Sequence, residues 1–426
     1  MNNSRKILEV YNELAVDPDQ FTRQAVAGNE SLPIEILESL KEDEGYYIKA
    51  KLASNPKSTS ALLKALLNLE DATVCHLLGA NPNTPEDIVF KILDHHYYYG
   101  SSVAKNPKIS ARCVEYLLNK KYSLTNLATN QNLTADTYAK LATLEYVELL
   151  ENLAKNRSTP PSVLATLAES KKIDVRIEVG RNPNTDASTL AYLVNKSKNQ
   201  KVLEMVARNA NADTATLNTL FENVEFHSSL AYNPNLELDK LSVLLQSDNK
   251  WVRGPAVRNT GTPSKIANEY VSDPEPEVRA DLASRTNEPL ILKILANDPS
   301  DSVRSRVASS SHATPEILEA LSLDSEMFVL FEVCINPKTP IRVLQKIINQ
   351  EDIGIFYRSG VAQNSSISEE LLTEICDSIY ASNHSYKEES IAKLPRIPLK
   401  YFNLLSRSTN EEIRRIIAGI HIPNIV

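Results

Sequence analysis

An asparagine recurs every 24 to 30 residues along most of this 426-residue chain, and no other feature constrains the fold as strongly. We call its position the anchor. A fixed period of this length is typical of solenoid proteins, in which each repeat is one supersecondary unit. Two repeats carry Arg285 and Ser310 at the anchor, and the last two carry Leu394 and Ile420. The asparagine anchors are Asn29, Asn55, Asn81, Asn106, Asn130, Asn156, Asn182, Asn209, Asn233, Asn259, Asn336 and Asn364.

The period predicts one continuous all-α solenoid over residues 1–426, with about sixteen two-helix repeats and no β-sheet. Apolar residues make up 42% of the chain and only 10 residues are glycine, which favours packed helices. No apolar run is long enough to cross a bilayer and no signal-peptide core opens the sequence, so we expect a cytoplasmic protein. Residues 1–16 are predicted to form an N-terminal capping helix and residues 400–426 a C-terminal capping repeat.

Each repeat has the pattern of two short helices joined by a polar corner. Apolar residues at seven, three and two positions before the anchor have the spacing of a first helix. The anchor ends this helix, because asparagine tolerates the left-handed conformation and bonds neighbouring backbone, and proline often follows it. A Thr-Pro pair, as in Thr84-Pro85, is expected to cap a second helix. That helix ends near an aspartate about twelve residues before the next anchor, at Asp17, Asp43, Asp94, Asp273, Asp298, Asp324 and Asp352.

The segments VRIEVGRNPNT, from Val175 to Thr185, and VRSRVASSSHATPEILEALSLD, from Val303 to Asp324, resemble the leucine-rich repeat variant family of HEAT-like helical repeats. The resemblance covers nearly the whole chain. It implies alternating α- and 3₁₀-like helices in a right-handed superhelix. Some members carry an N-terminal iron–sulfur domain ligated by cysteines, but this chain has no cysteine before Cys75, so we expect no cofactor.

Half of the repeats place a basic residue six positions before the anchor. Such a row could bind a phosphate backbone or an acidic partner. We favour the alternative that each pairs with an acidic residue of its own or a neighbouring repeat, often the aspartate of the preceding corner. Unpaired like charges about 10 Å apart would repel one another. The row comprises Arg23, Lys49, Arg176, Arg253, Arg279, Arg304, Arg358 and Arg414.

A second set of cations, which we call the basic row, stands immediately before the anchor and is concentrated in the central repeats. It could bind a partner, or it could be solvated charge at helix C-termini, which the helix dipole favours. The formal charge of −8 argues against wholesale binding to nucleic acid. The basic row comprises Lys105, Lys155, Arg181, Arg208 and Arg258, with Lys393 farther along the chain.

Aromatic residues stand eight positions before the anchor in the repeats toward both ends, while the middle repeats carry charged residues there. If these rings face outward, they suit partner anchors of the kind enriched in interface hot spots. If they face inward, they fill wedges between first helices. Their exposure distinguishes the two readings. This aromatic row comprises Phe21, Tyr47, Tyr98, Tyr122, Trp251, Phe328, Phe356 and Tyr386.

Signs of metal binding or catalysis are weak. Residues 94–100, DHHYYYG, place His95 and His96 at a turn beside one aspartate, which favours a solvated or packed turn over a metal site. The four cysteines are far apart, and Cys334 fills a slot that suits a small core residue. We find no phosphate-binding glycine loop and no hydrolase or metalloprotease motif, so we predict no catalytic, cofactor or metal residues.

These patterns predict a non-enzymatic scaffold or adaptor that binds an extended protein partner along the solenoid surface. The aromatic row would anchor the partner, and the charged middle would set orientation and association rate. The alternative is a nucleic-acid-binding HEAT-like protein that uses a central basic groove. A third reading, a lyase or chaperone for a chromophore-bearing protein, rests on fold analogy alone. We expect no membrane partner.

Overall fold

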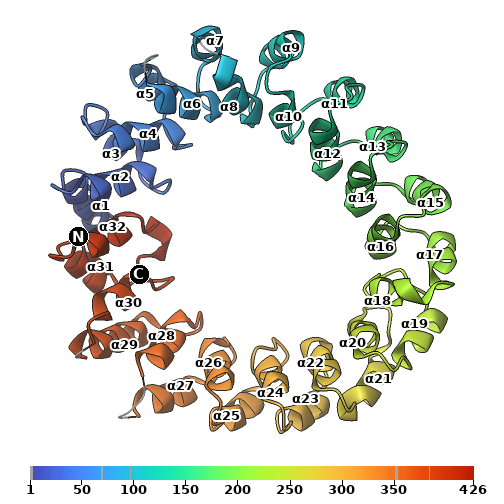
Figure 1. Ribbon diagram of the computed structural model, residues 1–426. Helices are drawn as coiled ribbons and strands as arrows, with labels where there is room; N and C mark the ends of the chain where they lie inside the picture. The colour runs from blue at the N-terminus through green and yellow to red at the C-terminus, as the bar shows by residue number, and fades with distance from the viewer. Residues whose placement is uncertain (1–2, 69–70, 96, 351–353, 383) are drawn as a thin grey trace. The chain divides into compact units, whose positions relative to one another are not determined.

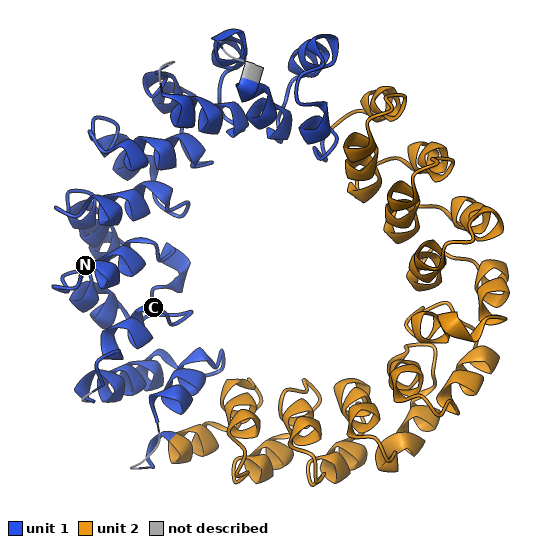
Figure 2. Ribbon diagram, in the orientation of Figure 1, with its two compact units in different colours: residues 1–132, 348–426 blue, residues 133–347 orange. Residues whose placement is uncertain are grey.

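Helices of two alternating kinds make up the chain (Figure 1). The computed structural model describes residues 3–68, 71–95, 97–350, 354–382 and 384–426. The protein is 65% helical, and no strand occurs in those ranges, so the predicted all-α helical-repeat fold is confirmed. No helix within them is long and apolar enough to span a membrane. Contacts divide the chain into unit 1, residues 1–132 and 348–426, and unit 2, residues 133–347 (Figure 2).

The even-numbered helices are the first helices of the repeats, and each ends just before an anchor. In unit 1 they are α2 (Gln20–Gly28), α4 (Tyr46–Ser54), α6 (Ala72–Ala80), α8 (Gly100–Lys105), α10 (Leu124–Leu127), α28 (Ile355–Gln363), α30 (Lys387–Ala392) and α32 (Glu411–Ala418). In unit 2 they are α12 (Val147–Lys155), α14 (Ile173–Arg181), α16 (Gln200–Arg208), α18 (His227–Leu230), α20 (Lys250–Arg258), α22 (Pro276–Arg285), α24 (Asp301–Ala308) and α26 (Met327–Ile335).

The odd-numbered helices are the second helices, and they too are α-helical. In unit 1 they are α1 (Asn3–Leu14), α3 (Ile34–Ser39), α5 (Ser60–Ala65), α7 (Glu86–His95), α9 (Ala111–Lys120), α29 (Glu369–Ala381) and α31 (Leu399–Leu405). In unit 2 they are α11 (Ala135–Ala142), α13 (Pro161–Ala168), α15 (Ala187–Lys196), α17 (Thr214–Phe221), α19 (Leu238–Leu245), α21 (Ser264–Ala267), α23 (Pro289–Leu295), α25 (Pro315–Leu321) and α27 (Ile341–Ile348). Short 3₁₀ turns occur at η1 (Tyr97–Tyr99), η2 (Val224–Phe226), η3 (Asn268–Ser272) and η4 (Ile422–Asn424).

The two kinds of helix form two layers within each unit. Neighbouring first helices pack against one another, and second helices pack against first helices next to them in sequence, as α13 does against α12 and α14 and α25 against α24 and α26. The core lies between the layers: Val175 and Val179 of α14 and Leu164 of α13, two helices in contact, are all fully buried. Within unit 2 the first helices line the inner side of an arc and the second helices its outer side (Figure 2).

The anchor asparagine links one repeat to the one before it. The side-chain amide of Asn182 donates to the carbonyls of Ala154 and Asn156 at 2.7 and 2.9 Å, and its side-chain oxygen accepts the Asn184 amide. Its backbone is extended, with φ −66° and ψ 125°, so the predicted left-handed conformation is wrong. A following proline favours the extended region, but Asn209, which alanine follows, is extended too, with φ −75° and ψ 123°, so the corner itself favours this conformation.

The threonine of the corner also acts differently from the prediction. Where threonine stands three positions after the anchor, its hydroxyl donates back to the first helix, as Thr185 does to the Val179 carbonyl at 2.6 Å. The second helix is then capped one residue later, by Asp186 in this repeat. Where threonine stands four positions after the anchor, as Thr314 does after Ser310, it caps the second helix, with Pro315 in the first turn here.

The arginine six positions before the anchor forms a clamp between two corners. Arg253 donates from Nε and Nη2 to the Asp273 carboxylate, both at 2.9 Å, and from Nη1 to the Ser247 carbonyl at 2.7 Å. The predicted pairing is therefore correct in kind. The carboxylate, however, comes from the following corner, and the preceding corner supplies only its carbonyl. The clamps pair Arg23 with Asp43, Arg253 with Asp273, Arg279 with Asp298, Arg304 with Asp324, and Arg414 with Asp17.

The terminal segments of the chain together form one repeat in unit 1. The last first helix, α32, has no second helix after it in sequence, and α1 takes that place. Helix α1 packs against α31, α32 and α2, which are the kinds of neighbour that α13 has in α11, α12 and α14. Helix α1, in the N-terminal cap predicted over residues 1–16, therefore lies against α31 and α32, in and beside the C-terminal cap predicted over residues 400–426. The single solenoid expected over residues 1–426 stays a prediction.

The hydrogen bonds of the repeat continue across this junction. The side-chain amide of Asn29 donates to the carbonyls of Ala418 and Ile420 at 3.1 and 2.8 Å, as other anchors do to the repeat before them. The buried ring of Tyr11 lies 5.3 Å from that of Phe402. The last repeat of the chain is thus the structural predecessor of the first.

Candidate interaction surface

The aromatic row and the basic row lie on one face of the first helices. They stand eight and one positions before the anchor, seven residues apart, which is about two helical turns. Positions seven, three and two before the anchor are buried, as at Val252, Ala256 and Val257. The stripe at positions eight, five, four and one lies on the other side of the first helix, and we call it the first-helix face. Positions eight and one are exposed in most repeats, whereas positions five and four between them are half-buried in most repeats and are buried at Gly254 and Pro255. In unit 2 the first-helix face belongs to the helices on the inner side of the arc (Figure 2).

The aromatic row is exposed at seven of its eight positions. The exposed fraction is 62% for Trp251, 65% for Phe328, 66% for Tyr98 and 70% for Tyr386. Tyr122 is the half-buried exception. Rings that filled wedges between first helices would be buried, so the inward reading does not hold for the row as a whole. The other exposed members are Phe21, Tyr47 and Phe356.

Parts of the row in unit 1 form a continuous aromatic surface. The rings of Phe21 and Tyr47, on α2 and α4, are stacked with centroids 6.2 Å apart. The guanidinium of Arg415, from α32, lies 4.6 Å from the Phe21 ring. At the next helix the row carries Thr73 instead of an aromatic residue, and an open hollow of about 560 Å³ lies there with Tyr98 on its wall.

The basic row is largely neutralised by the chain itself. Lys155 pairs with Glu151 at 3.4 Å, Arg181 with Glu178 at 2.7 Å, and Arg258 approaches Asp281 at 3.8 Å. Arg208 donates to the Ser229 hydroxyl and lies over the Tyr232 ring. Lys105 and Lys393 belong to unit 1, and Lys393 pairs with Glu389. The row is therefore not a free strip of positive charge.

Tyr232 belongs to this surface and was not among our predicted residues. It is 53% exposed and stands at the basic-row position of its repeat, immediately before Asn233. The guanidinium of Arg208 lies 5.4 Å from its ring centroid. Considering the basic and aromatic positions as one face would have found it, because both positions recur on the same side of the helix.

Two carboxylates of the first-helix face, Asp281 and Glu332, are half-buried. Burial raises the pKa of Asp281 on α22, against the opposing effect of Arg258. Burial likewise raises the pKa of Glu332 on α26, against that of Arg306. A Cβ at position 254 would lie 2.5 Å from an Asp281 carboxylate oxygen, so a larger residue there would displace that carboxylate. The face thus carries acidic groups between the aromatic and basic rows.

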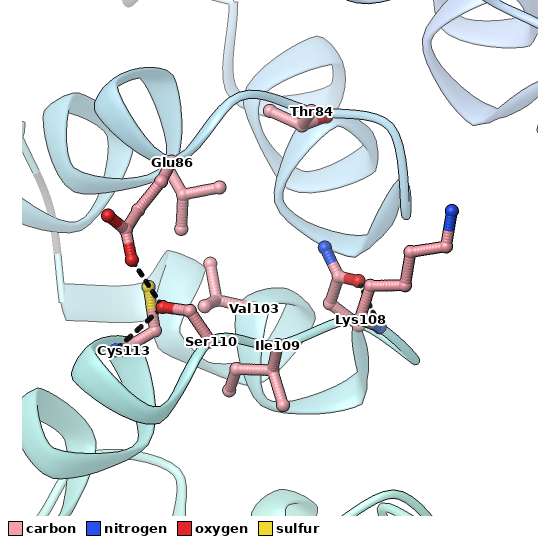
Figure 3. Close-up of a pocket in the computed structure, with 9 residues that line it drawn as sticks. Thr84, Glu86, Val103, Lys108, Ile109, Ser110 and Cys113 are labelled. Carbon is pink, nitrogen blue, oxygen red and sulfur yellow. Dashed lines mark hydrogen bonds between the residues drawn. The ribbon is translucent and has the colours of Figure 1, made fainter.

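One small pocket lies between α7 and α9 (Figure 3). The Ser110 hydroxyl donates to the Glu86 carboxylate and accepts the Cys113 amide. The volume of about 50 Å³ holds a few waters and is far below the roughly 300 Å³ of a metabolite site. Burial raises the pKa of the Cys113 thiol, which does not favour a thiolate nucleophile.

The structure brings no metal ligands together in the part of the chain that it describes, since no group of three His, Cys, Asp or Glu side chains could hold an ion. His95 ends α7, while His96 and Asp352 lie outside the described residues. The four cysteines, Cys75, Cys113, Cys334 and Cys376, are buried and unbridged.

Comparisons with known proteins find only distant likenesses. No family profile and no curated protein matches the chain. A solved leucine-rich repeat variant is 17% identical with a TM-score of 0.31, over 59% of this chain and 88% of that one. The karyopherin Kap121p bound to Nup53p is 11% identical with a TM-score of 0.26, over 91% of this chain and 45% of that one. UNC-45 from Drosophila melanogaster is 14% identical with a TM-score of 0.20, over 97% and 62%.

Proposed function

We propose that the protein is a non-enzymatic scaffold that binds an extended protein partner along its first-helix face, and that it is a member of the leucine-rich repeat variant family. The observation that carries the binding role is the exposure of the aromatic row. Large aromatic rings exposed at repeat spacing are suited to interface anchors, since they bury much area at low entropic cost. Membership in the family is supported by the Asn-Pro corner and the arginine clamp.

The partner that this face favours carries both apolar and charged side chains. Trp251 and Phe328 provide apolar contacts in unit 2, and the Lys250 ammonium lies 5.5 Å from the Trp251 ring. Charged groups of both signs lie between these rings, which favours a partner of matching polarity over a purely apolar one. Carboxylates of the chain itself pair with much of the basic row. No observation therefore favours duplex nucleic acid as the partner.

Site-specific photocrosslinking tests the proposal in native cells. A photoreactive phenylalanine derivative is placed at Tyr47 or Phe328 in the full chain, and crosslinked proteins are identified by mass spectrometry. We expect discrete adducts with a protein partner from both positions. The matched control places the same group at Leu290 or Leu323, which are 76% and 74% exposed but lie off the first-helix face.

A second experiment replaces two residues of the aromatic row. With the photoreactive residue at Tyr47, the double substitution Trp251→Ala and Phe328→Ala should abolish recovery of the crosslinked partner, whereas Leu290→Ala with Leu323→Ala should not. Both pairs should unfold at nearly the wild-type temperature, because surface substitutions are usually within about 0.5 kcal/mol. Equal crosslinking from the face and from the control positions would rule out the proposed surface.

A further inference from the structure

The hollow beside α6 interrupts the aromatic row of unit 1. Helix α6 packs against α4 on one side and α8 on the other (Figure 1). The row carries Tyr47 on α4 and Tyr98 just before α8, with Thr73 between them. The rings of Phe21 and Tyr47 are stacked at 6.2 Å, but Thr73 offers no ring that would continue this stack. The row therefore lacks one aromatic group at α6.

This hollow is open to solvent and mainly apolar. Its volume of about 560 Å³ lies within the range of roughly 300–1,000 Å³ of small-ligand sites, so a large side chain fits inside. Tyr98 is 66% exposed, and the three residues that line the hollow from the first turns of α6 are exposed as well. The lining consists of Ala72, Thr73, His76 and Leu77 of α6 with Tyr98 and Tyr99 of η1.

An aromatic ring suits this hollow better than an aliphatic side chain, because two of its walls are tyrosines. Aromatic pairs gain more than their area burial when they are offset-stacked or edge-to-face, with centroids about 4.5–7 Å apart. The neighbouring repeats use both arrangements. Tyr47 is stacked with Phe21 and meets the ring of Tyr46 edge-on at 5.3 Å. A ring above Thr73 would pack against Tyr98 in one of these ways.

The charge beside the hollow is positive. Lys105 stands at the basic-row position of the next repeat, is exposed, and forms no ion pair with any described residue. Its charge reaches the lining, because the pKa of His76 is lowered first by burial and then by Lys105. The Asp71 carboxylate, next to Ala72 in sequence, is engaged as the cap of α6. Lys105 therefore favours an anionic group beside whatever fills the hollow.

We propose that the hollow binds an aromatic side chain of the protein partner, and that an aspartate or glutamate adjoins this side chain in the partner's sequence. The ring packs over Thr73 against Tyr98, where a ring of the chain itself stands in the repeats on either side. The carboxylate lies near Lys105. This inference rests on the proposed scaffold function and specifies the residues that the partner presents to α6.

Saturation-transfer NMR with the full chain tests the proposal, because it detects weak binding of small peptides. The probe is the acetylated and amidated pentapeptide Ser-Glu-Phe-Glu-Ser, and its control is Ser-Glu-Ala-Glu-Ser. We expect strong saturation of the phenylalanine ring protons and little of the alanine methyl. Thr73→Trp fills the hollow from within the chain and should weaken binding of the first peptide about tenfold.

Ser302→Trp is the matched control, because it adds the same side chain at the same exposed position of the row in α24. It should leave peptide binding unchanged. Tyr98→Ala removes a wall of the hollow without filling it and should weaken binding about fivefold. This variant decides the matter if Thr73→Trp folds poorly.

The acidic neighbour of the ring is tested separately. Lys105→Gln should weaken binding of Ser-Glu-Phe-Glu-Ser about threefold, since exposed ion pairs contribute little. It should leave binding of Ser-Gln-Phe-Gln-Ser unchanged. An equal effect on the two peptides would overturn the assignment of a carboxylate to Lys105.

Two further results would overturn the proposal: no saturation of the phenylalanine ring by the wild type, or wild-type binding by both Thr73→Trp and Tyr98→Ala. Photocrosslinks from Tyr47 without peptide binding would refute the hollow and leave the first-helix face standing. Loss of the photocrosslinks, with peptide binding that Thr73→Trp still weakens, would refute the proposed scaffold function and leave the aromatic site standing.

Discussion

Arg414 holds the carboxylate of Asp17 at 2.8 and 3.2 Å, although 397 residues separate the two in the chain. Nη1 of the same guanidinium donates to the Ser408 carbonyl at 2.8 Å, which completes a clamp of the kind found inside the stack. Both side chains are nearly buried, with exposed fractions of 13% and 9%. The pair therefore joins the terminal repeats by the same contact that joins consecutive ones.

Removing Asp17 should loosen both ends of the chain together. We expect Asp17→Ala to destabilise unit 1 by about 3 kcal/mol, because a nearly buried guanidinium loses its counter-ion. Hydrogen exchange should accelerate in α1 and α32, which lie at opposite ends of the sequence. Asp324→Ala, which breaks the Arg304 clamp within unit 2, is the control and should affect α24 and α26 but not α1. Unchanged exchange in α1 on Asp17→Ala would contradict the junction.

Acid should weaken the same junction through Asp19. Its hydrogen bonds with Arg415, and then with Thr22 and the backbone of α2, hold the pKa of this carboxyl far below its usual range. The folded state thus favours the charged form, so this contribution to stability is complete above about pH 4. It is lost as the pH falls from there toward the folded-state value. Urea unfolding at pH 5 and pH 3 should show a smaller loss of stability for Asp19→Asn than for the wild type. An equal loss in both would count against this assignment.

The anchor asparagine should be far more sensitive than the asparagine two residues later. Asn182 is 3% exposed, and its amide serves two carbonyls of the preceding repeat. Asn182→Asp sets a carboxylate against those oxygens and should cost about 3 kcal/mol at neutral pH. Asn184→Ala, which removes one exposed amide bonded to the Thr159 carbonyl at 3.0 Å, should cost under about 1 kcal/mol. Similar losses in urea unfolding would refute the inter-repeat role of the anchor.

Buried thiols should report the opening of each unit separately. Burial raises the pKa of Cys334 in unit 2, and that of Cys376 in unit 1, to about 12. Neither should react with Ellman's reagent at pH 8 in the folded protein, since the thiolate is the reactive form. Labelling rates of variants that retain one of the two cysteines should rise with urea as the corresponding unit opens. Reaction at the rate of a free thiol without urea would show that the core is not closed around it.

The repeat itself could be predicted from the sequence because its corner chemistry recurs at a fixed spacing. The buried positions before Asn182 follow directly from helical periodicity, as Val175 and Val179 show. The conformation of the anchor could not be taken from the general preference of asparagine, because the corner is extended both at Asn182, before proline, and at Asn209, before alanine. Asparagine also has a second task, donation to the preceding repeat, that no local pattern reveals.

The candidate surface was only partly predictable. Position eight before the anchor adjoins a core position, so whether Trp251 or Phe328 faces inward depends on how the next helix packs. The direction of the clamp was equally hidden, since aspartates lie at both the preceding and the following corner. The pairing of Arg414 with Asp17 did leave a signal in the sequence. If the sequence is continued from its last residue to its first, Asp17 stands at the corner that follows the last repeat.

The completion of the last repeat by α1 also sets an order of events during synthesis. Helix α1, whose Ile7, Val10 and Leu14 are buried, is made long before α31 and α32, which pack against it. Unit 2 has all of its residues before α28 to α32 are made, so it can fold ahead of them during translation. In unit 1 the apolar face of α1 stays uncovered until α31 and α32 have been made. This face is therefore the part of unit 1 that chaperones would bind on the nascent chain.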